Sequence, residues 1–287
     1  KLDLQIKHNE TGQWESYGDN QSGDKVEYRE IATVPIGLSE YTEYKYVIHG
    51  QIENCISFNN DVVIKINDTD TELSSDYYTV TLGYNNDFDI NFDILKAIAD
   101  GKLNEGDNLY VYHTGTCKED MWIAPSAPTM MASLEYTDAT NDGTTKTESK
   151  AVRDYTFGFE GSFVDDKSNG IANGEFELYR DGEILHFVKQ TNPDGSVIYN
   201  VSPEGDVQAI TLSEKGTFNI NGLDDNIQYT LKQTEANANT LKLKAEPITF
   251  TIIPSYNDNG TISSVSTDSD KVTALNGSFK VSTNIVG

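Results

Sequence analysis

Short stretches of alternating apolar and polar residues dominate the chain, and Gly, Asn and Asp interrupt them at short intervals. Val, Ile, Tyr, Phe and Thr fill these stretches, which is the pattern of half-buried β-strands. The clearest examples are residues 24–34, 43–50, 61–67, 76–84, 107–115, 154–159, 174–180, 184–190, 196–201, 216–220, 228–234, 247–253 and 278–283. Strands this short and this evenly spaced predict sandwiches or Greek-key barrels, so the expected fold class is mainly β.

One window has the spacing of a helix instead. In Phe92–Leu103 the apolar residues Ile94, Leu95 and Ile98 share one helical face. Asp93 near its start and Gly101 near its end match the preferences for helix caps. We therefore expect one short helix in an otherwise all-β first domain.

The pattern breaks once, between residues 137 and 150, where the sequence is polar and shows no periodicity. A length of 287 residues also suits two domains better than one small sandwich. The prediction is a first domain at 1–140, a linker at 141–150 and a second domain at 151–287.

The strongly negative net charge argues against one class of binding partner, nucleic acids. The formal net charge is −25 and the pI is near 4.3, so a polyphosphate would be repelled and nucleic acid is not an expected partner. A solvated extracellular surface explains the acidity most simply, and bound calcium is the alternative. No run of 18 apolar residues occurs, so no membrane insertion is expected in this segment.

Chemistry-bearing residues are scattered. His113 and Cys117 share a strand face but lie about 13 Å apart, which is too far for a catalytic dyad. The four histidines, His8, His49, His113 and His186, have no zinc-ligand spacing. The acidic segments 67–76 and 85–93 lack the spacing of an EF-hand loop. We expect no enzyme, no cofactor and no metal site.

The second half resembles a known module. Residues 163–179 resemble the opening Lys-Val-Asp stretch and Phe-x-Leu strand of CnaB-type immunoglobulin-like domains. Residues 216–236 resemble the Gly-x-Phe, Gly-Leu and Tyr-x-Leu-x-Glu-Thr stretch of the same domains, and residues 279–287 resemble their last strand. These domains build the sortase-assembled pilins and surface adhesins of Gram-positive bacteria.

The first half resembles the fimbrial backbone domain of such pilins. The similar segments follow one another in the family's order, at 22–35, 44–50, 76–82, 106–116 and 132–139. The resemblance implies two tandem immunoglobulin-like sandwiches in an extracellular, cell-wall-anchored subunit, with other pilus subunits as partners. The signal peptide and sorting signal are expected to lie outside this segment. Shaft pilins carry a Tyr-Pro-Lys-type linkage motif, and its absence here favours a tip, basal or stand-alone role.

In this family an internal isopeptide bond between a Lys and an Asn, assisted by a buried acid, usually locks each domain. The resemblance places the lysine, acid and asparagine positions at Phe163, Gln233 and Asn284 in the second domain, and at Leu4, Gly50 and Lys118 in the first. Lys1 and Lys7 lie an odd number of residues from Leu4, so they point to the opposite face, and Lys167 lies in an expected turn. Neither domain is therefore predicted to form the bond, and Phe163 would fill the space of the lysine stem.

Cys55 and Cys117 are the only cysteines and lie 62 positions apart. They can form one disulfide or remain two buried free thiols. A disulfide would stabilise the fold by roughly 4 kcal/mol through loop closure. Cys55 follows the isopeptide-equivalent position Gly50 by five residues, and Cys117 immediately precedes the isopeptide-equivalent position Lys118. We therefore predict that a disulfide between Cys55 and Cys117 substitutes for the missing isopeptide bond.

The expected function is a structural or adhesive subunit of a Gram-positive pilus or wall-anchored fibre. The alternative is a carbohydrate- or matrix-binding module of a secreted surface protein, with Trp14, Trp122 and exposed tyrosines as a stacking surface for a host glycan or matrix ligand.

Overall fold

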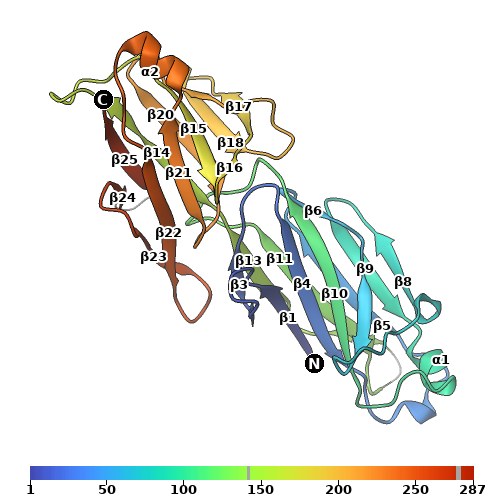
Figure 1. Cartoon of the computed structure of the whole chain (residues 1–287). Coiled ribbons are helices and arrows are strands. Elements are labelled where there is room, and N and C mark those ends of the chain that lie inside the picture. The colour runs from blue at the N-terminus through green and yellow to red at the C-terminus, as the bar shows by residue number, and fades with distance from the viewer. Residues whose placement is uncertain (141–142, 276–278) are drawn as a thin grey trace. The chain divides into compact units, whose positions relative to one another are not determined.

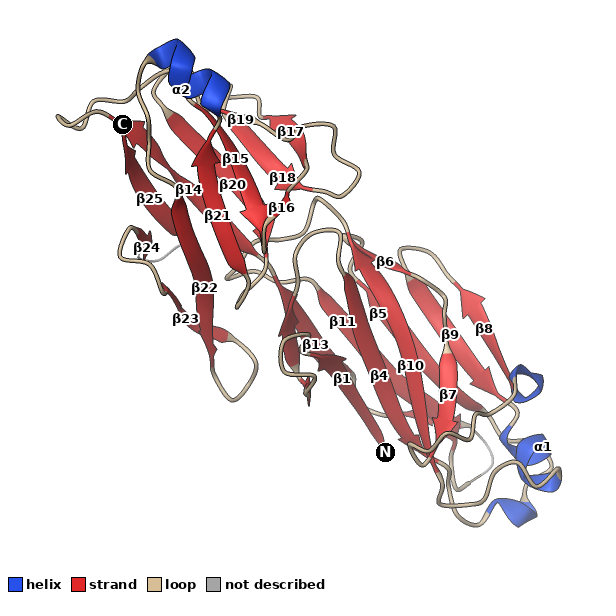
Figure 2. Ribbon diagram, viewed as in Figure 1, coloured by secondary structure: helices blue, strands red, loops and turns tan. Residues whose placement is uncertain are grey.

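The structure is a computed structural model that describes residues 1–140, 143–275 and 279–287. Strands make up most of its regular structure, so the mainly β class predicted from the alternation is confirmed (Figures 1 and 2). The chain folds as two compact units. The first contains residues 1–18, 25–116 and 128–154, and the second contains residues 19–24, 117–127 and 155–287.

The first unit contains two sheets. One has the strand order β2-β1-β4-β10-β6, with β7 paired to β10. Its strands are β1 (Leu2–Lys7), β2 (Trp14–Glu15), β4 (Lys25–Thr33), β6 (Ile56–Phe58), β7 (Val63–Ile66) and β10 (Asn108–Cys117). The other has the order β3-β13-β11-β5-β9-β8, with β12 paired to β11. Its strands are β3 (Tyr17–Asp19), β5 (Tyr46–Ile52), β8 (Tyr78–Leu82), β9 (Asp87–Phe92), β11 (Thr129–Thr137), β12 (Thr144–Lys146) and β13 (Lys150–Tyr155).

The core of the first unit lies between these sheets, because every second side chain of β1, β4, β5, β9 and β10 is buried. The rings of Phe88 on β9 and His113 on β10 meet across the two layers, 5.2 Å apart. The predicted helix is present but shorter, as α1 (Ile94–Ala99). The Asp93 side chain caps it by accepting from the Lys96 N–H, and Gly101, with φ of +69°, follows its end. Two short 3₁₀ turns are η1 (Leu38–Glu40) and η2 (Ser75–Tyr77).

The second unit also contains two sheets. One has the order β17-β18-β20-β14-β25-β24, and the other has the order β16-β15-β21-β22-β23 with β19 paired to β15. The strands of the first are β14 (Phe157–Val164), β17 (Phe187–Thr191), β18 (Val197–Val201), β20 (Thr217–Leu223), β24 (Val272–Ala274) and β25 (Val281–Val286). The strands of the second are β15 (Glu175–Arg180), β16 (Glu183–Ile184), β19 (Ile210–Thr211), β21 (Gln228–Gln233), β22 (Ile248–Tyr256) and β23 (Ile262–Thr267).

Aromatic rings fill the core of the second unit. Phe159 on β14 packs against Phe250 on β22, 4.6 Å between ring centroids, which joins the two sheets. A second helix, α2 (Glu235–Leu241), follows β21 and was not anticipated from the apolar pattern, because none of its residues is buried. The Thr234 side chain caps it by accepting from the Asn237 N–H.

The division between the units differs from the predicted boundaries. Residues 144–146 and 150 of the predicted linker, and residues 151–153 at the start of the predicted second domain, pair with β11 as β12 and β13. Residues 141 and 142 of the predicted linker lie outside the described residues. Residues 19–24 and 117–127 join the second unit, where the Arg180 guanidinium lies 2.9 Å from Asp24 and the Tyr229 hydroxyl donates to Gln21. These two segments are connectors without a strand pattern, so nothing in the sequence assigned them to the second unit.

Candidate functional site

Phe163, at the lysine position of the second unit, is fully buried on β14. Its ring packs edge to face with Phe176 on β15, with 5.3 Å between centroids. The backbones of Gly174 and Gly287 approach so closely that a Cβ at either residue would lie within 3 Å of the ring. The ring therefore occupies a tightly packed space in which a side chain of a different shape would not fit without rearrangement.

Gln233, at the acid position, lies opposite Phe176 in the β15–β21 ladder and is buried. Its Oε1 accepts from the Ala245 N–H at 2.9 Å, and its Nε2 donates to Asn237 Oδ1 at 2.9 Å. A neutral amide can make both of these bonds at once, whereas a carboxylate could only accept. The structure thus places both Phe163 and Gln233 beside Phe176 and satisfies Gln233 without a charge.

Asn284 does not reach this core. In the parallel ladder of β14 and β25, Asn284 pairs with Ser162, and Ile285 pairs with Phe163. Asn284 is exposed, and with Ser162, Asn219 and Ser282 it lines a cavity of about 600 Å³ on the outer face of the sheet. Because side chains alternate along a strand, the residue that faces Phe163 inward is Ile285.

The three positions in the first unit are not gathered together. Leu4 is buried on β1, and Gly50 lies on β5 in the other sheet. A Cβ at Gly50 would lie 2.2 Å from the Phe88 ring, so the aromatic ring takes the space of a side chain there. Lys118 is exposed and belongs to the second unit.

A buried polar pair lies next to Leu4. Glu30 on β4 is the direct ladder partner of Leu4, and both side chains point inward. The His113 Nε2 lies 2.9 Å from each carboxylate oxygen of Glu30, and neither side chain is accessible to solvent. Strand alternation placed His113 on the same face as Cys117, but the sequence could not show that β4 and β10 pair in the register that brings Glu30 to it.

Aromatic rings enclose the histidine of this pair. Tyr28, Phe58 and Phe88 lie 5.6, 5.5 and 5.2 Å from the His113 ring centroid. His113 Nδ1 is buried and has no hydrogen-bond partner among the described residues. With no water or substrate access, the pair can orient strands and neutralise charge inside the sandwich, and it has no geometry for catalysis on an external molecule.

The lysines lie outside both cores. The described residues include every lysine of the chain, and none of these lysines is buried. Lys1 is exposed, and the Lys7 Nζ lies 3.1 Å from Glu27 on the outer face of its sheet. Isopeptide formation needs a desolvated neutral amine, which none of these positions supplies.

Both cysteines are described and buried, and no disulfide joins Cys55 to Cys117 in this structure. Cys55 belongs to the first unit, whereas Cys117, at the end of β10, belongs to the second. A disulfide between them stays a prediction. Alkylation of the chain, purified and unfolded without reductant, tests it. Two alkylated thiols would contradict the disulfide.

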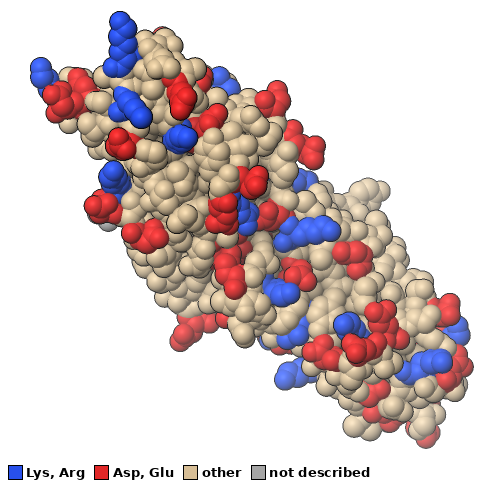
Figure 3. All heavy atoms as spheres, viewed as in Figure 1, with Lys and Arg blue, Asp and Glu red and all other residues tan. Residues whose placement is uncertain are grey.

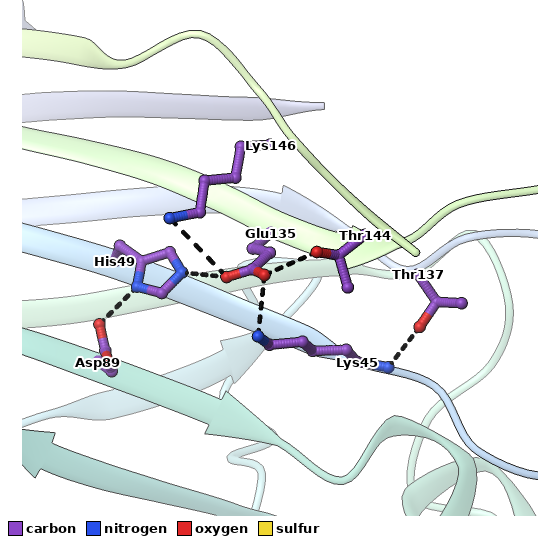
Figure 4. A network of polar contacts seen from close by, with 7 residues as sticks. All are labelled: Lys45, His49, Asp89, Glu135, Thr137, Thr144 and Lys146. Carbon is purple, nitrogen blue, oxygen red and sulfur yellow. Dashed lines mark hydrogen bonds and ion pairs between the residues drawn. The ribbon is translucent and has the colours of Figure 1, made fainter. Parts of the chain in front are cut away.

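A polar network on the outer face of the first unit was missed by sequence reasoning (Figure 4). His49 on β5 lies between two carboxylates, with Nδ1 2.6 Å from Asp89 on β9 and Nε2 2.7 Å from Glu135 on β11. An imidazole ring donates from both nitrogens only when it is protonated, so this geometry suits a charged ring. The sequence alone did not bring these residues together, because only the strand order β11-β5-β9 makes them neighbours.

Glu135 is the centre of the network. The Lys45 Nζ lies 2.8 Å from its Oε1, the Thr144 hydroxyl donates to the same oxygen at 2.8 Å, and the Lys146 Nζ lies 3.9 Å from Oε2. The bonds from Lys45 and then from His49 lower the pKa of Glu135 to about 2. Glu135 is therefore ionised at neutral pH and ties β11 to β5 and β12.

The two tryptophans lie in different units. Trp14 is half-buried on β2, with the Arg29 guanidinium stacked 4.5 Å from its ring and the Tyr112 ring 5.7 Å away at its edge. Trp122 is 47% exposed and belongs to the second unit. Acidic and basic side chains are interspersed over the face shown in Figure 3. None of the described helices has the length and apolar character needed to cross a bilayer.

Comparison by sequence finds no matching family model and no matching curated protein. Comparison by structure finds pilins. The 35 kDa C-terminal fragment of the major pilin GBS80 of Streptococcus agalactiae matches with a TM-score of 0.64 and 19% identity, over 88% of this chain and 90% of that one. The pilus backbone protein RrgB of Streptococcus pneumoniae matches with a TM-score of 0.61 and 13% identity, over 100% of both chains. BcpA, the major pilin subunit of Bacillus cereus, matches with a TM-score of 0.58 and 15% identity, over 100% of this chain and 70% of that one.

These similarities extend over both units rather than one sandwich alone, since each covers most or all of the chain. The fold of this chain is that of the Gram-positive backbone pilins.

Proposed function

We propose that this chain is a structural subunit of a Gram-positive cell-surface pilus or wall-anchored fibre. The observation that supports this is the similarity of fold to backbone pilins across both units. The subunit would be exported, anchored to the cell wall and joined to other pilus or surface subunits. Its work is mechanical and needs no catalytic group.

The strand pairing of the second unit suits a load-bearing role. Its first strand, β14, and its last strand, β25, lie side by side and run parallel, with partners from Phe159–Val281 to Val164–Val286. A force that pulls on the two ends of this unit loads these hydrogen bonds in shear, so the whole ladder must break at once. This shear geometry resists extension better than an unzipping geometry, in which the hydrogen bonds between two strands break one after another.

We further propose that neither unit contains the Lys–Asn isopeptide bond, because each lysine is solvent-accessible and the facing core residues are Phe163, Ile285 and Leu4. Replacing a buried lysine and its acid by apolar or neutral groups of similar volume need not destabilise a core. Resistance to force in this subunit would come from packing and hydrogen bonds.

Immunogold electron microscopy of the source bacterium tests the main proposal. Antibody raised against the chain should label fibres or the wall surface, and deletion of its gene should remove that label. Label along the shaft, at the tip or at the base would assign the position in the fibre. Label confined to the cell interior would contradict the proposal.

A carbohydrate- or matrix-binding module remains a second candidate, and the cavity on the outer face of the second unit favours it. Its lining contains the hydroxyl and amide groups of Ser162, Asn219, Ser282 and Asn284, which can bond to sugar hydroxyls. A glycan array with the intact chain should then give hits that an Asn219→Ala variant loses. Identical patterns for both proteins would place any binding elsewhere.

A further inference from the structure

The strand β8 ends one sheet of the first unit and has no strand on its other side within the described residues (Figures 1 and 2). Its sequence, Tyr78-Thr-Val-Thr-Leu82, contains no charged residue, no proline and no bulge. Edge strands normally carry such features because they prevent pairing with other chains. The lack of them is notable in a chain with a net charge of −25.

The backbone hydrogen bonds just beyond the two ends of β8 show which of its polar groups face solvent. The Gly83 N–H donates to Asp87 O, and the Asp93 N–H donates to Tyr77 O, so residues 77 and 83 direct their polar groups toward β9. Bonding alternates along an antiparallel strand, so Thr79 and Thr81 do the same. The N–H and C=O groups of Tyr78, Val80 and Leu82 therefore point outward, away from β9.

The side chains at this edge leave apolar surface uncovered. Tyr78, Val80 and Leu82 lie opposite Phe92, Ile90 and Phe88 in the ladder, on the core face of the sheet. Leu82 is nevertheless 57% exposed, and Tyr84 in the following turn is 91% exposed. The sheet thus ends in a strip that offers both hydrogen bonds and apolar contacts.

The sequence of β8 is almost the same read in either direction about Val80. We propose that β8 pairs with β8 of a second copy of this chain, antiparallel, on a twofold axis through Val80. Val80 then faces Val80 of the second copy, and Tyr78 faces Leu82. Each of these three pairs exchanges two backbone bonds, about six in total. On the outer face Thr79 meets Thr81, a favourable cross-strand pair.

Repulsion between the two Asp89 side chains does not oppose this contact at physiological salt. Asp89 lies on the outer face of the sheet, on β9, opposite Thr81. In the paired sheet, β9 and the β9 strand of the second copy would be separated by three inter-strand spacings, about 14 Å. That distance exceeds the Debye length of about 8 Å. Repulsion between two acidic chains should still weaken pairing at low salt, so association should increase as salt is added.

The proposal goes beyond the proposed function, because it concerns sideways contact between copies rather than assembly end to end. A contact of one short strand is small, so it would be weak between free chains and strengthened where many copies lie along parallel fibres. Failure of this pairing would leave the pilus proposal untouched, and immunogold labelling tests that proposal separately.

Sedimentation velocity of the intact chain, from about 10 μM to about 1 mM and at two salt concentrations, tests the pairing. We expect a concentration-dependent dimer in the wild type. Val80→Pro should abolish it, because proline removes an outward N–H while leaving the bonds to β9 intact. Leu82→Lys should weaken it about tenfold or more, as charged edges do in natural sheets. Ile36→Lys is the matched control, since Ile36 is 81% exposed outside β8 and should have no effect.

Hydrogen exchange gives a second measurement by residue. The amides of Tyr78, Val80 and Leu82 should exchange quickly at low concentration and slowly at high concentration, whereas those of Thr79 and Thr81 should be protected at both. A monomer throughout this range would overturn the proposal. So would a dimer that survives both Val80→Pro and Leu82→Lys, or exchange at the three outward amides that does not change with concentration.

Discussion

In the first unit Leu4 is one of the inward residues of β1, and its ladder partner is the buried Glu30, whose carboxyl group lies against His113. In the second unit the inward residue of β14 is Phe163, and its surroundings are Phe176, Ile285 and the amide of Gln233. Both positions are those at which the sequence resemblance predicts the lysine of the pilins. One unit keeps an ionisable pair next to that position, and the other has only neutral groups.

If neither unit forms the isopeptide bond, as we propose, the two units accommodate its absence in two ways. A buried ionic pair is costly to desolvate, and removing either partner strongly destabilises the fold because the other is left buried without its partner. An aromatic cluster stabilises through buried area and close packing, and it tolerates change in proportion to the volume removed. The two units should therefore respond differently to substitution, and Trp14 and Trp122 allow each to be followed by fluorescence.

The largest effect is expected from breaking the buried pair. His113→Leu leaves the Glu30 carboxylate in an apolar core and should lower the free energy of unfolding of the first unit by about 3–5 kcal/mol. Urea unfolding followed by Trp14, in a Trp122→Phe background, measures it. The double variant Glu30→Leu/His113→Leu should recover most of the loss, and no recovery would mean that packing rather than charge decides the effect.

A somewhat smaller effect is expected in the aromatic cluster. Phe163→Ala should cost the second unit about 3 kcal/mol through lost burial and a cavity against Phe176, and Phe163→Leu about 1 kcal/mol. Trp122 fluorescence in a Trp14→Phe background follows this unit. Equal costs for the two variants would show that the ring is not tightly packed.

The surface network should contribute less, and its contribution depends on pH. Glu135→Gln should cost about 1–2 kcal/mol at pH 7, because it removes the charged acceptor of Lys45 and His49. The pKa of Glu135 is about 2 in the folded chain, below the value of roughly 4.3 in an unfolded one. Its contribution is thus complete above about pH 5 and is lost as the pH falls toward 2. A difference between wild type and variant that stays constant from pH 7 to pH 3 would contradict this assignment.

The smallest effect is expected at Asn284. Because it is exposed, Asn284→Ala should change stability by less than about 0.5 kcal/mol, whereas Ile285→Ala next to it should cost about 2–4 kcal/mol. Thermal unfolding of the two variants compares them directly. A larger loss of stability for Asn284→Ala than for Ile285→Ala would place Asn284 in the core, where it could form a bond to a lysine.

The fold was largely predictable because strand alternation and turn residues are local signals. The sequence showed the strand-rich class and the helix capped by Asp93. It did not show α2, whose helix carries no buried residue, nor the transfer of residues 19–24 and 117–127 to the second unit. Those depend on contacts between distant segments.

The candidate sites were less predictable, because they depend on register. A shift of one residue along β25 exchanges Asn284 for Ile285 at the core. The pair of Glu30 and His113, and the network of His49, Asp89 and Glu135, form only when particular strands become neighbours. Each residue type was visible in the sequence, but its partner was not.

The intact mass of the reduced chain tests the central claim most directly, namely that neither sandwich contains a Lys–Asn cross-link. We predict a mass equal to that of the unmodified sequence, because no amine reaches either core. A deficit of about 17 Da, the mass of one ammonia, or a multiple of it would show that such a bond had formed and would contradict the account.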